Sequence, residues 1–203
     1  MKFKKRFLMV FCSVALLAGM LGGGTVSATD DSVQYDSTSL SRLYNEVANS
    51  PDPDKSFSQL SPTAQKALID SVTNLRFETT IIEGNSGWLL DAGGSNDLTI
   101  KLEGYSTGGE LIIEYFQRIM WYYDGDFITD VPVHQSWGIG HWPWAYDGVI
   151  GESESGGRWY SYFHRFSQGK FRFNIWILPD QVITPWVDQW AFADGSYSFT
   201  HGA

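Results

Sequence analysis

The chain has 203 residues, a formal net charge of −9, a single cysteine and an aromatic content of 16%. Binding to nucleic acid or to anionic lipid heads requires clustered Lys and Arg, so we expect neither partner for so acidic a protein. One cysteine also cannot form a disulfide framework within the chain.

The first 28 residues have the pattern of a secretory signal peptide. Four basic side chains lie between Lys2 and Arg6, an apolar run extends from Phe7 to Leu21, and Val26 and Ala28 fit the small-residue positions of a cleavage site. We expect cleavage after Ala28, which would give a secreted protein of about 175 residues with a net charge of about −13 and no membrane span. An uncleaved anchor is the alternative, because about 18 apolar residues begin to suffice for a span. Cleavage would remove Cys12 and leave no thiol for catalysis or metal binding.

A helical segment is predicted at residues 37–74, after a polar lead at 29–36 that we expect to be disordered. The first helix is indicated by apolar side chains at helical spacing, namely Leu40, Leu43, Tyr44 and Val47. The Pro-rich stretch at 49–53 ends it. Ser61 as N-cap and Pro62 at the first helical position mark the start of a second helix.

From residue 75 to 203 the pattern changes to that of a β-domain, which forms one globular unit with the helices. Leu98 to Glu103 alternates apolar and polar side chains, as a half-buried strand does. Leu111 to Tyr123 contains a possible helical pair, Glu114 and Arg118, but its Ile and aromatic content favours a long strand. Short strands between Gly-rich turns predict a mainly β fold, an antiparallel β-sandwich or a partly open barrel preceded by two short α-helices.

Two hairpins are predicted near the end of the chain. One runs from Arg158 to Leu178 with its turn at Gln168–Gly169, and the other from Gln189 to His201 around Asp194–Gly195. The acidic stretch Gly151–Gly156 only mimics the nucleophile motif G-x-S-x-G, and we expect a flexible loop there.

The segment His134–Gly148, HQSWGIGHWPWAYDG, is the most aromatic part of the chain, and eight of the nine tryptophans lie between Trp121 and Trp190. Pro143 cannot donate a ladder hydrogen bond, so we predict a loop or an irregular edge here. Aromatic rings on a loop are available to stack on the apolar faces of sugars, although a Trp-rich core is the alternative. We therefore predict a site for a polysaccharide or a cell-envelope ligand that consists of Trp137, His141, Trp142, Trp144, Tyr146 and Asp147.

The sequence predicts no catalytic residue, no metal site and no cofactor. His134, His141 and His164 do not have the spacing of known zinc motifs, and the Asp91–Asp97 loop lacks the full calcium-binding pattern. A hydrolase would need two carboxylates, or a histidine and a carboxylate, that converge in a pocket, and the spacing along the chain shows no such pair. A structural or interaction module is a further alternative, and the sequence does not indicate an oligomeric state.

Three aromatic motifs follow one another in the C-terminal third of the chain. They are Trp137-Gly138-Ile139-Gly140, the stretch Arg158–His164, and Trp190-Ala191-Phe192-Ala193. Their order resembles the lactococcin-nine-seven-two bacteriocin family of small secreted β-sandwich peptides. The resemblance implies an antagonist that acts on a bacterial envelope precursor. It assigns Tyr160, Ser161, Tyr162 and His164 to the second element and Trp190, Ala191 and Ala193 to the third. A second histidine, expected a few residues after that strand, is missing where this chain has Lys170-Phe171.

Overall fold

Three short helices precede the strands in the computed structural model, which describes residues 34–84, 87–89, 93–175 and 180–203. They are α1 (Ser37–Ala48), α2 (Pro53–Ser58) and α3 (Pro62–Thr73). At each start a side-chain oxygen, from Asp36, Asp52 or Ser61, accepts a main-chain N–H. Two helices were predicted, and the short α2 is a third, which begins where the Pro-rich stretch at 49–53 ends. The predicted signal peptide lies outside the described residues.

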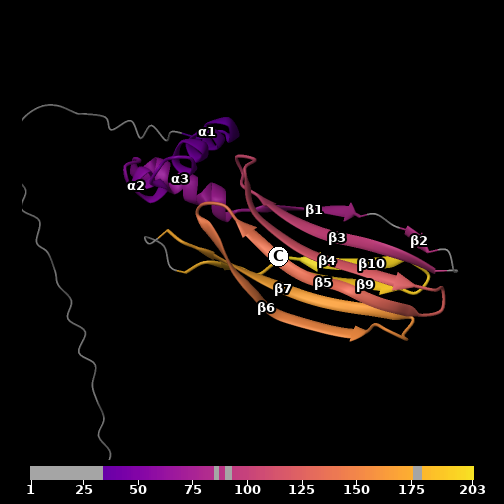
Figure 1. Ribbon diagram of the computed structural model, residues 1–203. Helices are drawn as coiled ribbons and strands as arrows, with labels where there is room; N and C mark the ends of the chain where they lie inside the picture. The colour runs from indigo at the N-terminus through magenta and orange to yellow at the C-terminus, as the bar shows by residue number, and fades with distance from the viewer. Residues whose placement is uncertain (1–33, 85–86, 90–92, 176–179) are drawn as a thin grey trace, which may run out of the picture. The chain divides into compact units, whose positions relative to one another are not determined.

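The strands form two antiparallel sheets, which confirms the predicted mainly β fold. Sheet A contains β1 (Arg76–Glu83), β2 (Gly87–Leu89), β3 (Gly93–Tyr105), β4 (Leu111–Tyr123) and β5 (Ile128–Gly140). Sheet B contains β6 (Trp144–Gly156), β7 (Tyr162–Phe173), β8 (Val182–Ile183), β9 (Trp186–Phe192) and β10 (Tyr197–Gly202). The strand order is β1-β3-β4-β5 in sheet A, with β2 also paired to β3, and β10-β9-β7-β6 in sheet B, with β8 also paired to β7. Figure 1 shows the long strands of both sheets running in roughly the same direction.

The hydrophobic core lies between the two sheets. Because side chains alternate along a strand, β4 directs Tyr115, Ile119 and Trp121 inward, and all three are fully buried. Each such side chain stabilises the fold by roughly 1.5–3 kcal/mol. Trp121 also donates a hydrogen bond of 3.1 Å from its indole to the main-chain oxygen of Phe192 in sheet B. The sheets therefore pack face to face as a sandwich.

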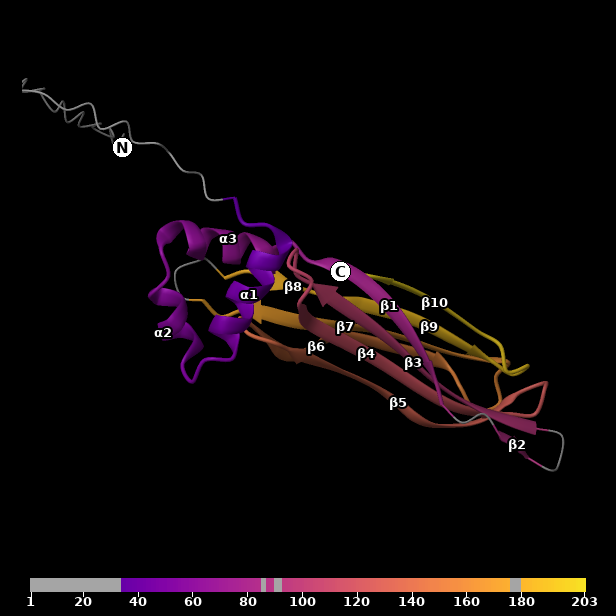
Figure 2. The same ribbon diagram turned by 90° about the horizontal axis from the view of Figure 1, so that it is seen from above.

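The helices contact the turns at one end of this sandwich (Figure 2). The Tyr44 hydroxyl of α1 donates to the main-chain oxygen of Trp142, which lies in the turn between β5 and β6, over 2.8 Å. The main-chain N–H of Thr107, between β3 and β4, donates to the oxygen of Ser71 in α3 over 3.2 Å. Within the described part of the chain, no helix is long and apolar enough to cross a membrane.

One predicted hairpin is confirmed and the other is wrong. β9 and β10 pair around Asp194–Gly195, where Gly195 has a φ of +85° that suits a turn glycine. By contrast, β7 runs without interruption through Gln168–Gly169. The reason for a glycine there is close packing, because a Cβ on Gly169 would lie 2.6 Å from the ring of Tyr115.

One predicted loop is a strand in the structure, and a segment predicted as a loop or an irregular edge lies in the edge strands of the two sheets. The stretch Gly151–Gly156 belongs to β6, where it pairs with β7, so it is not a flexible loop. The segment 134–148, predicted as a loop or an irregular edge, consists of the end of β5 and the start of β6, which are edge strands of their sheets. The pairing of β6 with β7 is irregular between Tyr146 and Gly148, and residues 141–143 form the turn that Pro143 indicated. Two positions of β5, Gly138 and Gly140, are glycines because a Cβ has no room there. The Tyr146 ring fills the space beside Gly138, and the main chain of Trp144 fills the space beside Gly140.

Candidate functional site

Two of the six predicted binding residues hold the helices against the strands. Trp144 is 3% exposed, and its indole donates to the main-chain oxygen of Val72 in α3 over 2.9 Å. Trp142 is partly exposed, its ring lies 5.9 Å from that of Phe57, and its indole donates to Asp54 over 3.1 Å. Trp144 is therefore a core residue and not an exposed ring.

Two more predicted residues lie in or beside sheet A. Trp137 stacks on Phe116, with ring centroids 4.9 Å apart and planes 5° from parallel. His141, just past the end of β5, has its Nε2 3.3 Å from a carboxylate oxygen of Glu114. Both side chains are partly exposed, and each already has a partner within the protein.

The last two predicted residues point in different directions from β6. The ring of Tyr146 packs 5.1 Å from Phe171 in the core, and burial raises the pKa of Tyr146 to about 12. Asp147 is exposed, where it pairs with Arg172 over 3.1 Å and with Lys170 over 3.8 Å. The six residues thus occupy several surroundings and do not form one shared surface.

A different set of rings lies on the outer face of β7 and β9. The register places Tyr162 opposite Phe192, His164 opposite Trp190, and Phe166 opposite Asp188. Their sequence neighbours Arg165, Val187 and Gln189 are buried against sheet A, so this set faces outward, and every member is partly exposed. We call this surface the aromatic face; it consists of Tyr162, His164, Phe166, Trp186, Asp188, Trp190 and Phe192.

The rings of the aromatic face contact one another. Trp190 stacks on His164, with ring centroids 4.2 Å apart and planes 27° from parallel. The ring of Tyr162 also contacts Trp190, with centroids 5.4 Å apart. Phe166 and Trp186 form a second pair at 6.2 Å. Such contacts restrict ring motion, so the face presents pre-positioned rings.

Polar side chains are set among these rings. The Nε2 atom of His164 pairs with the Asp188 carboxylate, and the Ser155 hydroxyl lies 3.4 Å from the Nδ1 atom of the same imidazole. The three residues come from neighbouring strands, β6, β7 and β9. The aromatic face therefore combines stacking rings with hydrogen-bonding groups in fixed positions.

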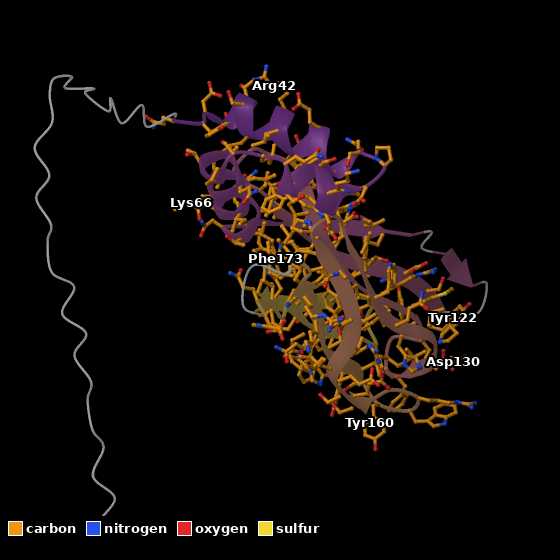
Figure 3. All side chains as sticks on the ribbon, turned by 90° about the vertical axis from the view of Figure 1, so that its left-hand side faces the viewer. Arg42, Lys66, Tyr122, Asp130, Tyr160 and Phe173 are labelled. Atoms are coloured by element: carbon orange, nitrogen blue, oxygen red, sulfur yellow. The ribbon has the colours of Figure 1, made fainter. Side chains whose placement is uncertain are left out.

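Exposed rings continue this face beyond the start of β7. Tyr160 is 56% exposed and its ring lies 6.2 Å from that of Tyr162; Figure 3 shows Tyr160 at the end opposite the helices. Trp159 is 63% exposed and has a φ of +72°, a strained conformation for a residue with a bulky side chain. Hydrogen bonds of 2.8 Å from Trp159 N–H to Ile128 oxygen and from Ile128 N–H to Tyr160 oxygen hold this backbone in place.

The chain matches no protein-family model, no curated protein and no solved structure. The three motifs of the bacteriocin resemblance lie in β5, at the start of β7 and at the end of β9. The resemblance stays a prediction.

A charged cluster lies between the inner sides of β5 and β6. Arg165, only 5% exposed, donates to Glu152 over 3.1 Å and pairs with Glu154, whose carboxylate lies 2.8 Å from His134 Nδ1. Together with Ser153 these residues line an open cavity of about 420 Å³. The fold thus brings together two carboxylates and a histidine, which sequence spacing did not indicate. The Arg165 guanidinium forms ion pairs with the carboxylates of both Glu152 and Glu154. The cluster therefore joins β6 to β7 as an ion-pair network.

Local sequence contains a signal for the aromatic face that our prediction missed. In the stretch Trp186–Phe192, WVDQWAF, the large or charged side chains alternate with Val187, Gln189 and Ala191, which are fully buried. This period of two marks a strand with one face in the core and an aromatic face outside.

No group of three His, Cys, Asp or Glu suited to a metal ion occurs among the described residues.

Proposed function

We propose that this chain is a secreted binding protein that recognises a polysaccharide or another glycan of a cell envelope through the aromatic face. The observation that carries the proposal is the row of partly exposed rings on β7 and β9 with Asp188 and His164 set among them. Flat rings stack on the apolar faces of sugars, and carboxylate and imidazole groups bond to hydroxyls.

The charge of the chain favours a sugar over the other ligands that aromatic faces bind. Single-stranded nucleic acid also stacks on rings, but it needs a positively charged groove, and the net charge here is −9. An apolar lipid surface would cover Asp188 and His164 without hydrogen-bonding to them, and this desolvation is unfavourable. A glycan satisfies both the rings and the polar groups.

The location of the protein is part of the proposal. The pattern of basic, apolar and small residues up to Ala28 supports export and cleavage, which would bring the aromatic face to extracellular glycans. Sequencing the N-terminus of protein recovered from the culture medium should give a chain that starts at Thr29. A full-length chain retained in the cells would contradict this part of the proposal.

Binding is tested with purified protein and a panel of insoluble and soluble polysaccharides, monitored by pull-down and by tryptophan fluorescence. Trp186→Ala and Trp190→Ala should each weaken binding by about tenfold or more, because truncation of a Trp at the centre of an interface costs at least about 1–2 kcal/mol. Trp137→Ala, which removes a ring from sheet A, is the matched control and should bind normally. Loss of binding in Trp137→Ala alone would locate the site on sheet A, and no response to any glycan would contradict the proposal.

A further inference from the structure

The two tryptophans of β9 are spaced for a ligand longer than one sugar ring. Trp186 and Trp190 lie on the same face of the strand, four residues apart, which corresponds to about 13 Å at the usual rise of ~3.3 Å per residue. A single pyranose ring cannot contact both indoles at once. Simultaneous contact requires a ligand that follows the strand direction.

Each indole has a structural reason to lie along the sheet. A Cβ on Gly202 of β10 would lie 2.7 Å from the Nε1 atom of Trp186, so the Trp186 ring occupies the space that a side chain at position 202 would fill. Trp190 lies almost parallel to the His164 imidazole of β7. The Trp186 ring thus lies beside Gly202 of β10 and Phe166 of β7, the Trp190 ring lies on His164 of β7, and the two offer separate stacking positions.

The surface between these two positions is polar. Asp188 lies midway between the tryptophans on the same face, and its carboxylate pairs with His164. A ligand that covers both rings must therefore place hydrogen-bonding groups over Asp188, or the carboxylate loses water without compensation. Successive sugars in a linear chain supply this alternation, because each unit has apolar ring faces and polar edges.

Charge restricts the chain further. The carboxylate at the centre of the aromatic face and the net charge of −9 both repel a chain with an acidic group on every unit. The nearest cations on the outer side of β7, Lys170 and Arg172, are already paired with Asp147. An uncharged or amine-bearing chain meets no such repulsion.

The geometry points to a linear, uncharged or amine-bearing glycan chain of several units, bound along β7 and β9 with sugars stacked on Trp186 and Trp190 and hydroxyl groups hydrogen-bonded to Asp188. This inference rests on the proposed function and adds the length, direction and charge of the ligand. The rings of Tyr162 and Tyr160 extend the same row toward the start of β7. Longer chains therefore gain additional contacts at that end.

The test measures binding of oligosaccharide ladders, from monosaccharide to hexasaccharide, by calorimetry at low salt. The probes are cello-oligosaccharides and chito-oligosaccharides as uncharged chains, chitosan oligomers as amine-bearing chains, and oligogalacturonates as acidic chains. Affinity should rise by about tenfold or more between the monosaccharide and the tetrasaccharide, because the second ring then binds an already tethered ligand. Acidic chains should bind more weakly than uncharged or amine-bearing chains of equal length.

Variants separate this inference from the proposed function. Trp186→Ala should reduce the gain with chain length to the part that Tyr162 and Tyr160 contribute, while weak binding of short sugars remains. Asp188→Asn should reduce the discrimination against acidic chains. Trp137→Ala should leave the length dependence intact. A monosaccharide that binds as tightly as the hexasaccharide, or a preference for acidic chains, overturns the inference and leaves the proposed function standing. If no ladder binds at any length, both are overturned.

Discussion

Trp144 and Val72 are joined by a hydrogen bond of 2.9 Å from the indole nitrogen to the main-chain oxygen. Val72 lies in the last turn of α3, where carbonyl oxygens have no partner within the helix. The indole therefore satisfies a buried acceptor at the helix end and fixes the start of β6 beneath it. This contact is one of several that connect the helical segment to the strands, and it spans 72 positions in the chain.

Replacing this indole should destabilise the fold. Trp144→Phe keeps a ring but leaves the Val72 oxygen without its donor, so we expect a loss of about 1–3 kcal/mol in the free energy of unfolding. Urea denaturation followed by circular dichroism measures it. Trp142→Phe removes the more exposed bond to Asp54 and should cost less than about 1 kcal/mol. Equal losses in the two variants would contradict this account of the helix junction.

The close contact of Gly169 with Tyr115 predicts a glycine that cannot be exchanged. A Cβ at this position would lie 2.6 Å from the Tyr115 ring, so Gly169→Ala should cost about 1–3 kcal/mol. Gly151, on the neighbouring strand β6, has only ordinary contacts at 3.8 Å or more, and Gly151→Ala should change stability by less than about 0.5 kcal/mol. Thermal melts of the two variants make the comparison, and a Gly169→Ala variant as stable as Gly151→Ala would show that the Tyr115 ring has room to move.

The carboxylate of Glu103 should make stability depend on pH on the acid side. Burial acts to raise the pKa of Glu103, but hydrogen bonds from Lys101 and Thr80 hold it below its ordinary value of 4.5. A depressed pKa in the folded state stabilises the fold above about pH 4.5, and this contribution is lost as the pH falls through the folded value. Urea midpoints measured between about pH 6 and pH 3 should therefore fall less steeply in Glu103→Gln than in the wild type.

The matched control for that experiment is Glu78→Gln, because Glu78 lies on β1 directly opposite Glu103 of β3. Glu78 pairs with Arg76 in an exposed contact, so its removal should change stability by less than about 0.5 kcal/mol at neutral pH. If the urea midpoint of Glu103→Gln falls with decreasing pH as steeply as that of the wild type, other groups determine the acid sensitivity of the fold.

Two core tyrosines should respond in opposite ways to loss of the hydroxyl. The Tyr146 hydroxyl is buried without a hydrogen-bond partner among the described residues, so Tyr146→Phe should leave stability unchanged or raise it by up to about 1 kcal/mol. The Tyr115 hydroxyl donates to Ser167 over 2.9 Å, and Tyr115→Phe should cost about 1 kcal/mol. Denaturant titrations measure the free energy of unfolding of both variants. A clearly lower value for Tyr146→Phe would indicate that the Tyr146 hydroxyl has a hydrogen-bond partner.

The fold was predictable where a local signal and the tertiary structure agree. Ser61 and Pro62 start α3 as expected, and Asp194–Gly195 turns β9 into β10. The same signal, an N-cap followed by proline, also starts α2 at Asp52–Pro53, but the nearby prolines were interpreted only as a break. Gly169 misled the prediction because sequence does not distinguish a turn glycine from one that accommodates a ring on a distant strand.

The candidate site was harder to predict because the exposure of a ring depends on distant elements. Trp144 and Trp142 looked available beside a turn, yet α3 and α2 reach them from more than 70 positions away. Trp186 and Trp190 alternate with buried residues in β9, and that pattern was visible in the sequence. Their combination with His164 into one surface depends on the pairing of β7 with β9, which the mistaken hairpin concealed.

The inward carboxylates of β6 also bear on solubility. β6 is the last strand of sheet B, and an edge strand presents unpaired main-chain groups to which another chain can add. Two register shifts interrupt its pairing with β7, and Glu152 and Glu154 point toward Arg165 beneath it. A strand from a second molecule would have to match those irregularities and desolvate the carboxylates. This edge is consequently a poor template for aggregation, a useful property in a protein with so many exposed rings.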